Sequence, residues 1–241
     1  MDYSRKYAEV MKKMWSNPYN DQRPCVLSWL NKYCKEFQTV LDIGPGDAYY
    51  LQQIKPKRYW IFEPNDILAE ITKKKVESLG IEFKRFKTIK EALDPENLSQ
   101  VDAVLMLHVL LYMEIYQIEV VLNTAKDKKI IMVNPSPGGA VTIKFEESMG
   151  NFRSQERIRL KEAILGNARY HEIAKTHFRL TPEIPLGDLS FLIAQLSINA
   201  SITDTHVVII KANNFIKEHI KEWKKKNYIE LPQEQVLELF N

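Results

Sequence analysis

The stretch TVLDIGPGDAYY at residues 39–50 decides the fold of this chain. Its first five residues are apolar or β-branched apart from one acid, which is typical of a buried strand. The tetrapeptide GPGD (residues 44–47) follows as a turn, and AYYLQQI (residues 48–54) can begin a helix. Glycine lacks the Cβ that would keep a ligand away from the backbone, and a helix start offers free N–H groups. The segment therefore predicts a strand-turn-helix unit that binds a ligand. The alternative is that the glycines only allow the chain to turn and bind no ligand.

A carboxylate ends the next predicted strand. YWIFE (residues 59–63) follows the helix, and Glu63 lies seventeen residues after Gly46. Nucleotide-binding sheets place an acid at this point, where it accepts hydrogen bonds from both ribose hydroxyls. An acid that is simply exposed at a strand end is the alternative. The glycine turn and Glu63, each in its expected context, together favour a nucleoside ligand.

The nucleoside is expected to carry no phosphate. A dinucleotide fingerprint needs a third glycine three residues after Gly46, and this chain has the bulky Tyr49 there. The sequence also lacks a phosphate loop of the form G-x-x-x-x-G-K-[ST]. S-adenosylmethionine is the commonest nucleoside cofactor without a phosphate, so it is the predicted ligand.

The rest of the first half alternates between strands and helices. NDILAEITKKKVESLG (residues 65–80) is expected to be a helix that Asn65 or Asp66 caps and Gly80 ends. Other helices are expected at residues 3–15, 25–34, 90–93 and 115–125, and other strands at residues 81–86, 101–107 and 128–133. This alternation predicts parallel βαβ units in a doubly wound sheet.

The second half has a less regular pattern. Helices are expected at residues 157–167 and 188–196, and RYHEIAKTHFRLT (residues 169–181) alternates like an outer strand. THVVIIKA (residues 205–212) predicts a late strand, and residues 213–240 predict a pair of charged amphipathic helices around Pro232. One domain is expected, made of an N-terminal helical lid (1–36), a cofactor-binding core (37–140) and substrate-side segments with late strands and C-terminal helices (141–241).

The composition argues against several partners. Lys and Arg total 34 against 31 Asp and Glu, and the resulting net charge of +3 is too small to suggest a basic stripe for nucleic acid. No apolar run approaches the roughly 20 residues that span a bilayer. Residues 1–15 are polar and lack the apolar stretch of a signal peptide. A cytoplasmic protein with no membrane partner is expected, and nucleic acid is an unlikely partner.

Three segments resemble motifs of a known superfamily. VLDIGPGDAYY, IFEPND and VDAVLMLHVLLYM resemble the first, second and fourth motifs of class I methyltransferases. The first motif of that superfamily reads D/E-x-G-x-G-x-G, and this chain departs from it only at Ala48. The chain most resembles histamine N-methyltransferase and related small-molecule N-methyltransferases, over roughly residues 5–150 and again at GDLSFLIAQL and THVVIIKA.

The resemblance implies a fold, a reaction and a set of residues. The implied fold is an α/β, Rossmann-like, seven-stranded and mostly parallel sheet with helices on both faces. The implied reaction transfers a methyl group from S-adenosylmethionine to a small acceptor, with a nitrogen of an amine, imidazole or amino-acid derivative favoured. The implied cofactor-binding residues are Tyr7, Asp42, Gly44, Pro45, Gly46, Glu63, Pro64, Asn65, Leu107 and His108.

The acceptor side involves fewer candidates. By position in the family, Tyr112 forms an aromatic wall, and the acid that binds an amine could match Asp21. His108 and Tyr112 are the candidate catalytic residues. An imidazole can accept a proton near neutral pH, but the family carries a neutral amide at this position, which favours a positioning role for His108. NPSPGGAVTIKFEES (residues 134–148) is expected to be a lid loop.

Two other functions remain open from the sequence. A methyltransferase for RNA or protein would keep the cofactor but use a macromolecular acceptor, and a non-catalytic module would bind S-adenosylmethionine without turnover. No metal is expected, because the spacing of His171 and His177 matches no metal geometry.

Overall fold

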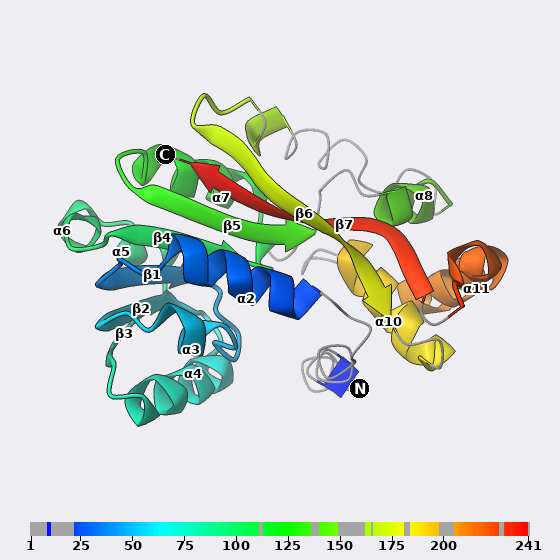
Figure 1. Cartoon of the computed structure of the whole chain (residues 1–241), viewed down its shortest axis with the longest axis horizontal. Helices are drawn as coiled ribbons and strands as arrows, with labels where there is room; N and C mark the ends of the chain where they lie inside the picture. The colour runs from blue at the N-terminus through cyan, green and yellow to red at the C-terminus, as the bar shows by residue number, and fades with distance from the viewer. Residues whose placement is uncertain are drawn as a thin grey trace. The chain divides into compact units, whose positions relative to one another are not determined.

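The computed structural model describes residues 9–10, 22–110, 113–135, 140–148, 162–164, 166–180, 184–197, 205–226 and 229–240. Figure 1 shows the arrangement of these segments. The strands are β1 (Thr39–Ile43), β2 (Arg58–Phe62), β3 (Glu82–Phe86), β4 (Ala103–Leu107), β5 (Lys129–Pro135), β6 (Tyr170–Leu180) and β7 (Ile229–Phe240). The helices are α2 (Gln22–Tyr33), α3 (Leu51–Ile54), α4 (Asp66–Ser78), α5 (Ile89–Ala92), α6 (Pro95–Ser99), α7 (Ile115–Thr124), α8 (Ala140–Ser148), α10 (Leu186–Ser197) and α11 (Thr205–Trp223).

The seven strands form a single Rossmann-like sheet, which confirms the predicted fold class. Their order is β3-β2-β1-β4-β5-β7-β6. β1 pairs in parallel with both β2 and β4, and the β2–β3 and β4–β5 pairs are parallel as well. The strand order therefore reverses between β1 and β4. Ligands of open α/β sheets bind beyond the carboxyl ends of the strands at such a switch point.

The strand β1, which lies between β2 and β4, is buried along its whole length. All five of its residues are shielded from solvent, and Val40 belongs to a core cluster with residues of α2, α3 and α4. Successive side chains of a strand point to opposite faces, so Leu41 and Ile43 fill the other side of the sheet. Asp42 shares the face of Val40 and is therefore an acid inside the core.

Local signals set the elements that surround the switch point. Asn65 caps α4, because its side-chain oxygen accepts hydrogen bonds from the backbone N–H groups of Ile67 and Leu68. The chain leaves α4 through Gly80, whose φ of 69° is the left-handed conformation that glycine tolerates. Both ends agree with the prediction for this helix. The predicted helix after the glycine turn is confirmed only over Leu51–Ile54, because residues 47–50 form turns.

Two predictions for the C-terminal part of the chain are wrong. THVVIIKA is not a strand: it begins α11, whose buried residues Val208, Ala212, Phe215 and Ile216 follow a helical spacing. The second predicted helix of the C-terminal segment is also wrong, because residues 229–240 form β7 between β5 and β6. The predicted outer strand is confirmed as β6, which lies at the edge of the sheet, and the helix at 188–196 is confirmed within α10.

The expected lid loop is also partly wrong. Asn134 and Pro135 belong to β5, and residues 140–148 form α8, whose Val141 and Phe145 are buried four residues apart. Gly138 and Gly139 lie outside the described residues, so the part of the lid prediction that falls on them stays a prediction.

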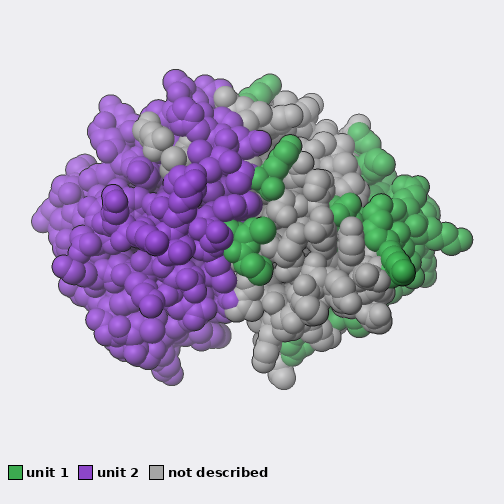
Figure 2. Space-filling model, viewed as in Figure 1, with its two compact units in different colours: residues 1–25, 135–162, 175–235 green, residues 26–134, 163–174, 236–241 purple. Residues whose placement is uncertain are grey.

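Contacts between residues divide the chain into two compact units, coloured separately in Figure 2. One unit contains residues 26–134, 163–174 and 236–241, and the other contains residues 1–25, 135–162 and 175–235. Strands β1 to β4 and helices α3 to α7 belong to the unit drawn in purple in Figure 2, which is unit 2. Within unit 1, drawn in green, α10 packs on α11, where the hydroxyl of Ser190 lies 3.4 Å from the side-chain oxygen of Asn213. Among the described residues, no helix is long and apolar enough to cross a membrane.

Candidate functional site

The turn after β1 passes tightly against the segment after β4. Gly44 has a φ of 67°, and its N–H donates to the carbonyl of Phe62 at 2.9 Å, which extends the β1–β2 ladder by one residue. A Cβ on Gly44 would overlap the side chain of Val109. Glycine is therefore required here twice, for the backbone conformation and for the contact with Val109.

The second glycine of the turn faces open space. Gly46 has a φ of 59°, and a Cβ at this position would meet no atom within 4 Å. Helix α4 holds this part of the turn: the hydroxyl of Thr72 donates to the carbonyl of Gly46 at 2.7 Å, and Nζ of Lys75 donates to the carbonyl of Asp47 at 3.1 Å. Hydrogen bonds to its carbonyls thus fix the turn, while the space beside Gly46 holds no atom within 4 Å of a Cβ built there.

Glu63 lies directly after β2, beside the glycine turn. Its residue exposure is 5%, and its Oε1 accepts a hydrogen bond from the backbone N–H of Asn65 at 2.9 Å. Burial raises the pKa of this carboxyl, and the backbone amides of Asn65 and Gly46 and the charge of Arg85 act in the opposite direction. Pro64 ends β2 because it has no N–H to continue the ladder. The carboxylate is therefore held by backbone donors at the mouth of the turn.

Asp42 is a buried acid that is only half satisfied. The hydroxyl of Tyr59 donates to its Oδ2, whereas Oδ1 has no hydrogen-bond partner among the described residues. Burial raises the pKa of Asp42 to about 7, the bond from Tyr59 lowers it, and the neighbouring charge of Glu63 raises it further. A buried carboxylate oxygen without a donor is costly, which agrees with the raised pKa of Asp42.

His108 marks the end of β4. Its φ of 59° is unusual for a residue with a Cβ, and its N–H donates to the carbonyl of Val133 at 2.7 Å. Its ring stacks on Tyr50 with a centroid distance of 5.7 Å, and Nε2 lies 3.0 Å from the Tyr50 hydroxyl. Burial lowers the pKa of His108 to about 4, so the imidazole is neutral at pH 7. The turn after β1 and the end of β4 thus meet through Tyr50 and His108.

Asn134 is a site residue that the sequence did not reveal. Its side chain is 1% exposed, donates from Nδ2 to the carbonyl of Met106 at 2.9 Å, and accepts at Oδ1 from the N–H of Leu110 at 3.1 Å. One amide therefore ties both sides of the bend that contains His108. A single buried asparagine at the end of a strand gives no sequence signal of such a role, because its partners are 24 and 28 residues away.

The structure brings most of the predicted residues to one edge of the sheet. Gly44, Gly46, Glu63 and His108 follow β1, β2 and β4 at their carboxyl ends. Leu107 is buried in the core at the end of β4, and the side chain of Asn65 is used to cap α4. Tyr7, Asp21 and Tyr112 lie outside the described residues.

Comparisons with known proteins give matches only among solved structures. No protein-family model matches the sequence, and no curated protein does. The YcgJ protein from Bacillus subtilis matches with a TM-score of 0.58 and 14% identity over 90% of this chain and 98% of that chain. A protein of Bacillus halodurans C-125, provisionally described as a methyltransferase, matches with a TM-score of 0.56 and 12% identity over 89% and 97% of the two chains.

The chain therefore shares a Rossmann-like fold with these two proteins. N-methyltransferase NodS from Bradyrhizobium japonicum WM9 is a more distant match, with a TM-score of 0.48 and 9% identity over 93% of this chain and 97% of that chain. At such identities a shared fold is all that the likeness establishes.

The Asp42 carboxyl predicts an unusual pH dependence of stability. Its pKa is about 7 in the folded protein and 3.8 in the reference state, so between these values the folded chain holds a proton that the unfolded chain has lost. The free energy of unfolding should therefore fall as the pH rises from about 4 to about 7, by on the order of 2–4 kcal/mol. Asp42→Asn keeps an acceptor for Tyr59 and removes the titration. Urea unfolding across this range should give a flatter profile for D42N than for wild type and for the exposed control Glu70→Gln, and parallel profiles would contradict the assignment.

Proposed function

We propose that this protein is an S-adenosylmethionine-dependent methyltransferase that acts on a nitrogen of a small molecule, as the histamine N-methyltransferase group does. The observation that carries the proposal is the fixed Glu63 carboxylate beside the glycine turn, at the switch point of a methyltransferase-like sheet. When bound, S-adenosylmethionine supplies a methyl group that its sulfonium activates toward a nucleophile.

The residues at the switch point fit this cofactor in size and charge. The open space beside Gly46 gives room for a ligand against the backbone. The ribose hydroxyls are donors that match the Glu63 carboxylate. The cofactor also carries positive charge, which would be stabilised by the buried acids Asp42 and Glu63. These features support a nucleoside with a cationic group.

His108 is assigned a positioning role toward the acceptor. Its imidazole is neutral, and Tyr50 holds the ring by stacking and by a hydrogen bond. A neutral ring fixed in this way can orient an acceptor through one hydrogen bond without adding a charge that would repel a cationic cofactor. Exclusion of water by the surrounding side chains would favour the unprotonated form of an amine acceptor, because desolvation lowers the pKa of an amine.

The cofactor assignment is tested by calorimetry with S-adenosylmethionine. Wild type should bind it, and Glu63→Ala should weaken binding by about 10- to 100-fold, since two charge-assisted hydrogen bonds are lost. Glu70→Ala is the matched control, because Glu70 is an exposed acid of the adjacent helix α4. Unchanged affinity in E63A would remove the ribose assignment, and absence of binding by wild type would overturn the proposed function.

A pair of glycine variants separates the effect of backbone strain on stability from the effect of a filled ligand space on cofactor binding. Gly46 and Gly80 have φ values of 59° and 69°, and a Cβ at either position would meet no atom within 4 Å. Alanine at either position should lower the free energy of unfolding by about 1–2 kcal/mol, the cost of a left-handed non-glycine residue. Only Gly46→Ala should also weaken S-adenosylmethionine binding, by about tenfold or more. Equal affinities of G46A and G80A would place the ligand elsewhere.

The acceptor class and the role of His108 are tested together. Amines, imidazoles and phenols are screened with a radiolabelled methyl donor, and a nitrogen compound is expected to become labelled. With that acceptor, His108→Gln should keep kcat within about tenfold, because a neutral hydrogen-bonding side chain replaces another. Removal of a general base would instead cost about 10²–10⁴-fold. Labelling of added RNA or protein only would contradict the small-molecule assignment.

A further inference from the structure

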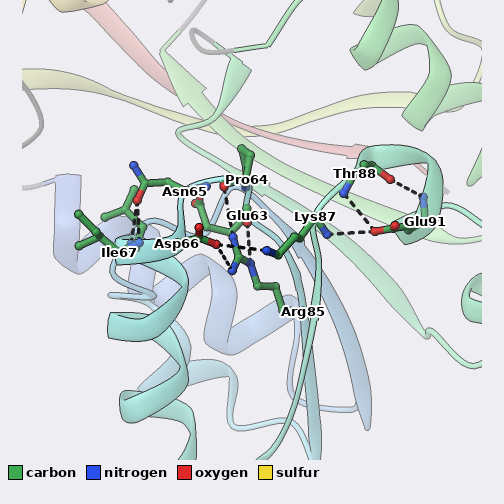
Figure 3. Close-up of polar contacts among 10 residues, drawn as sticks. Glu63, Pro64, Asn65, Asp66, Ile67, Arg85, Lys87, Thr88 and Glu91 are labelled. Carbon is green, nitrogen blue, oxygen red and sulfur yellow. Dashed lines mark hydrogen bonds and ion pairs between the residues drawn. The ribbon is translucent and has the colours of Figure 1, made fainter.

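Arg85, one residue before the end of β3, reaches the loop that follows β2 (Figure 3). Its Nε donates to the carbonyl of Glu63 at 2.9 Å, and one terminal nitrogen donates to the carbonyl of Pro64 at 3.2 Å. The other terminal nitrogen lies 2.6 Å from Oδ1 of Asp66. The Arg85 side chain is 18% exposed, so the guanidinium is mostly enclosed by these partners. A single side chain from β3 thus holds two residues of the loop and the first residue of α4.

The loop needs such a donor because of Pro64. Proline has no N–H and cannot continue a ladder, so the β2 strand stops and its next carbonyls lose their regular partners. A guanidinium presents several N–H groups in one fixed plane and can satisfy adjacent carbonyls at the same time. A lysine could reach one of these oxygens as a point charge, but it could not bridge them.

The backbone that Arg85 holds also directs the Glu63 carboxylate. Oε1 of Glu63 accepts from the N–H of Asn65, so its direction depends on the conformation of residues 63–65. The N–H of Glu63 donates to the carbonyl of Phe86 at 3.3 Å, which anchors the start of the loop to β3. With Arg85 removed, the carbonyls of Glu63 and Pro64 would need water, and the loop would gain freedom at the point where the carboxylate is attached.

We infer that Arg85 is a positioning residue, which fixes the Glu63 carboxylate in the orientation that accepts the ribose hydroxyls of the cofactor. This inference rests on the proposed function. Lys87 provides a natural contrast at the same end of β3: its Nζ lies 3.6 Å from Oδ1 of Asp66, but its side chain is 70% exposed. The geometry of Figure 3 therefore assigns the role to the guanidinium of Arg85 and not to positive charge in general.

The test is a double-mutant cycle of Arg85→Met and Glu63→Gln, read as the Kd of S-adenosylmethionine by calorimetry, with Lys87→Met as the control. R85M should weaken binding by about tenfold in the wild-type background and by less than about twofold in the E63Q background, because a residue that acts through Glu63 has no effect without its carboxylate. K87M should bind as wild type does. Arg85→Lys keeps the positive charge but loses the planar set of guanidinium N–H donors, so it should recover only part of the affinity. If R85M does not fold, R85K replaces it in the double-mutant cycle.

The outcomes separate this inference from the proposed function. Absence of binding by wild type would overturn the function itself. Binding by wild type, together with a loss on E63Q and an equal loss on R85M in both backgrounds, would overturn the inference alone, because Arg85 would then support the fold without acting through Glu63. Wild-type affinity in R85M would also overturn it.

Discussion

The close contact between Gly44 and Val109 is the constraint on which this site depends. β1 and β4 are neighbours where the strand order reverses, so the loops that follow them start side by side. The missing Cβ of Gly44 lets the Val109 side chain approach the turn, and this approach brings His108 against Tyr50. A larger residue at position 44 would push the two loops apart and open the site between them. The strained φ of His108 is maintained because Asn134 and Val133 hold the bend from β5.

Two buried acids near the same edge give the site its electrostatic character. Asp42 and Glu63 are each almost inaccessible to water, and the charge of Glu63 raises the cost of ionising Asp42. Neither has a cationic side chain placed directly on its carboxylate among the described contacts; Arg85 holds the backbone of Glu63 instead. A cationic ligand would relieve this repulsion, whereas a phosphate would add to it. For the proposed cofactor, this charge pattern and the absence of a third glycine would both favour a nucleoside without a phosphate.

The sequence predicts the parts of this molecule whose signals are local. TVLDI agrees with β1 residue for residue, and the Asn65 cap and Gly80 exit of α4 could be read from nearby residues. Asn134 and Arg85 could not be found in this way, because their partners are brought close only by the parallel pairing of strands. The predictions for residues 205–212 and 229–240 were wrong for a related reason. The β-branched run at 207–210 suggests a strand, but the apolar residues of the longer segment have a helical spacing, and a helix forms. Residues 229–240 form a strand although they contain Pro232, because β7 pairs with β5 and β6, which are distant in the sequence.

The low pKa of His108 also limits the chemistry that the site can perform. An amine resembling lysine has a pKa of about 10, and moving its proton to an imidazole with a pKa of about 4 would cost about 8 kcal/mol. Such a step would consume much of the gain that an enzyme obtains from orientation, which reaches about 7–11 kcal/mol. An acceptor that enters already neutral avoids this cost, because its lone pair is then available without a base. Under the proposed function, the burial that weakens His108 as a base would favour a neutral amine acceptor, and orientation would be the main contribution of this residue.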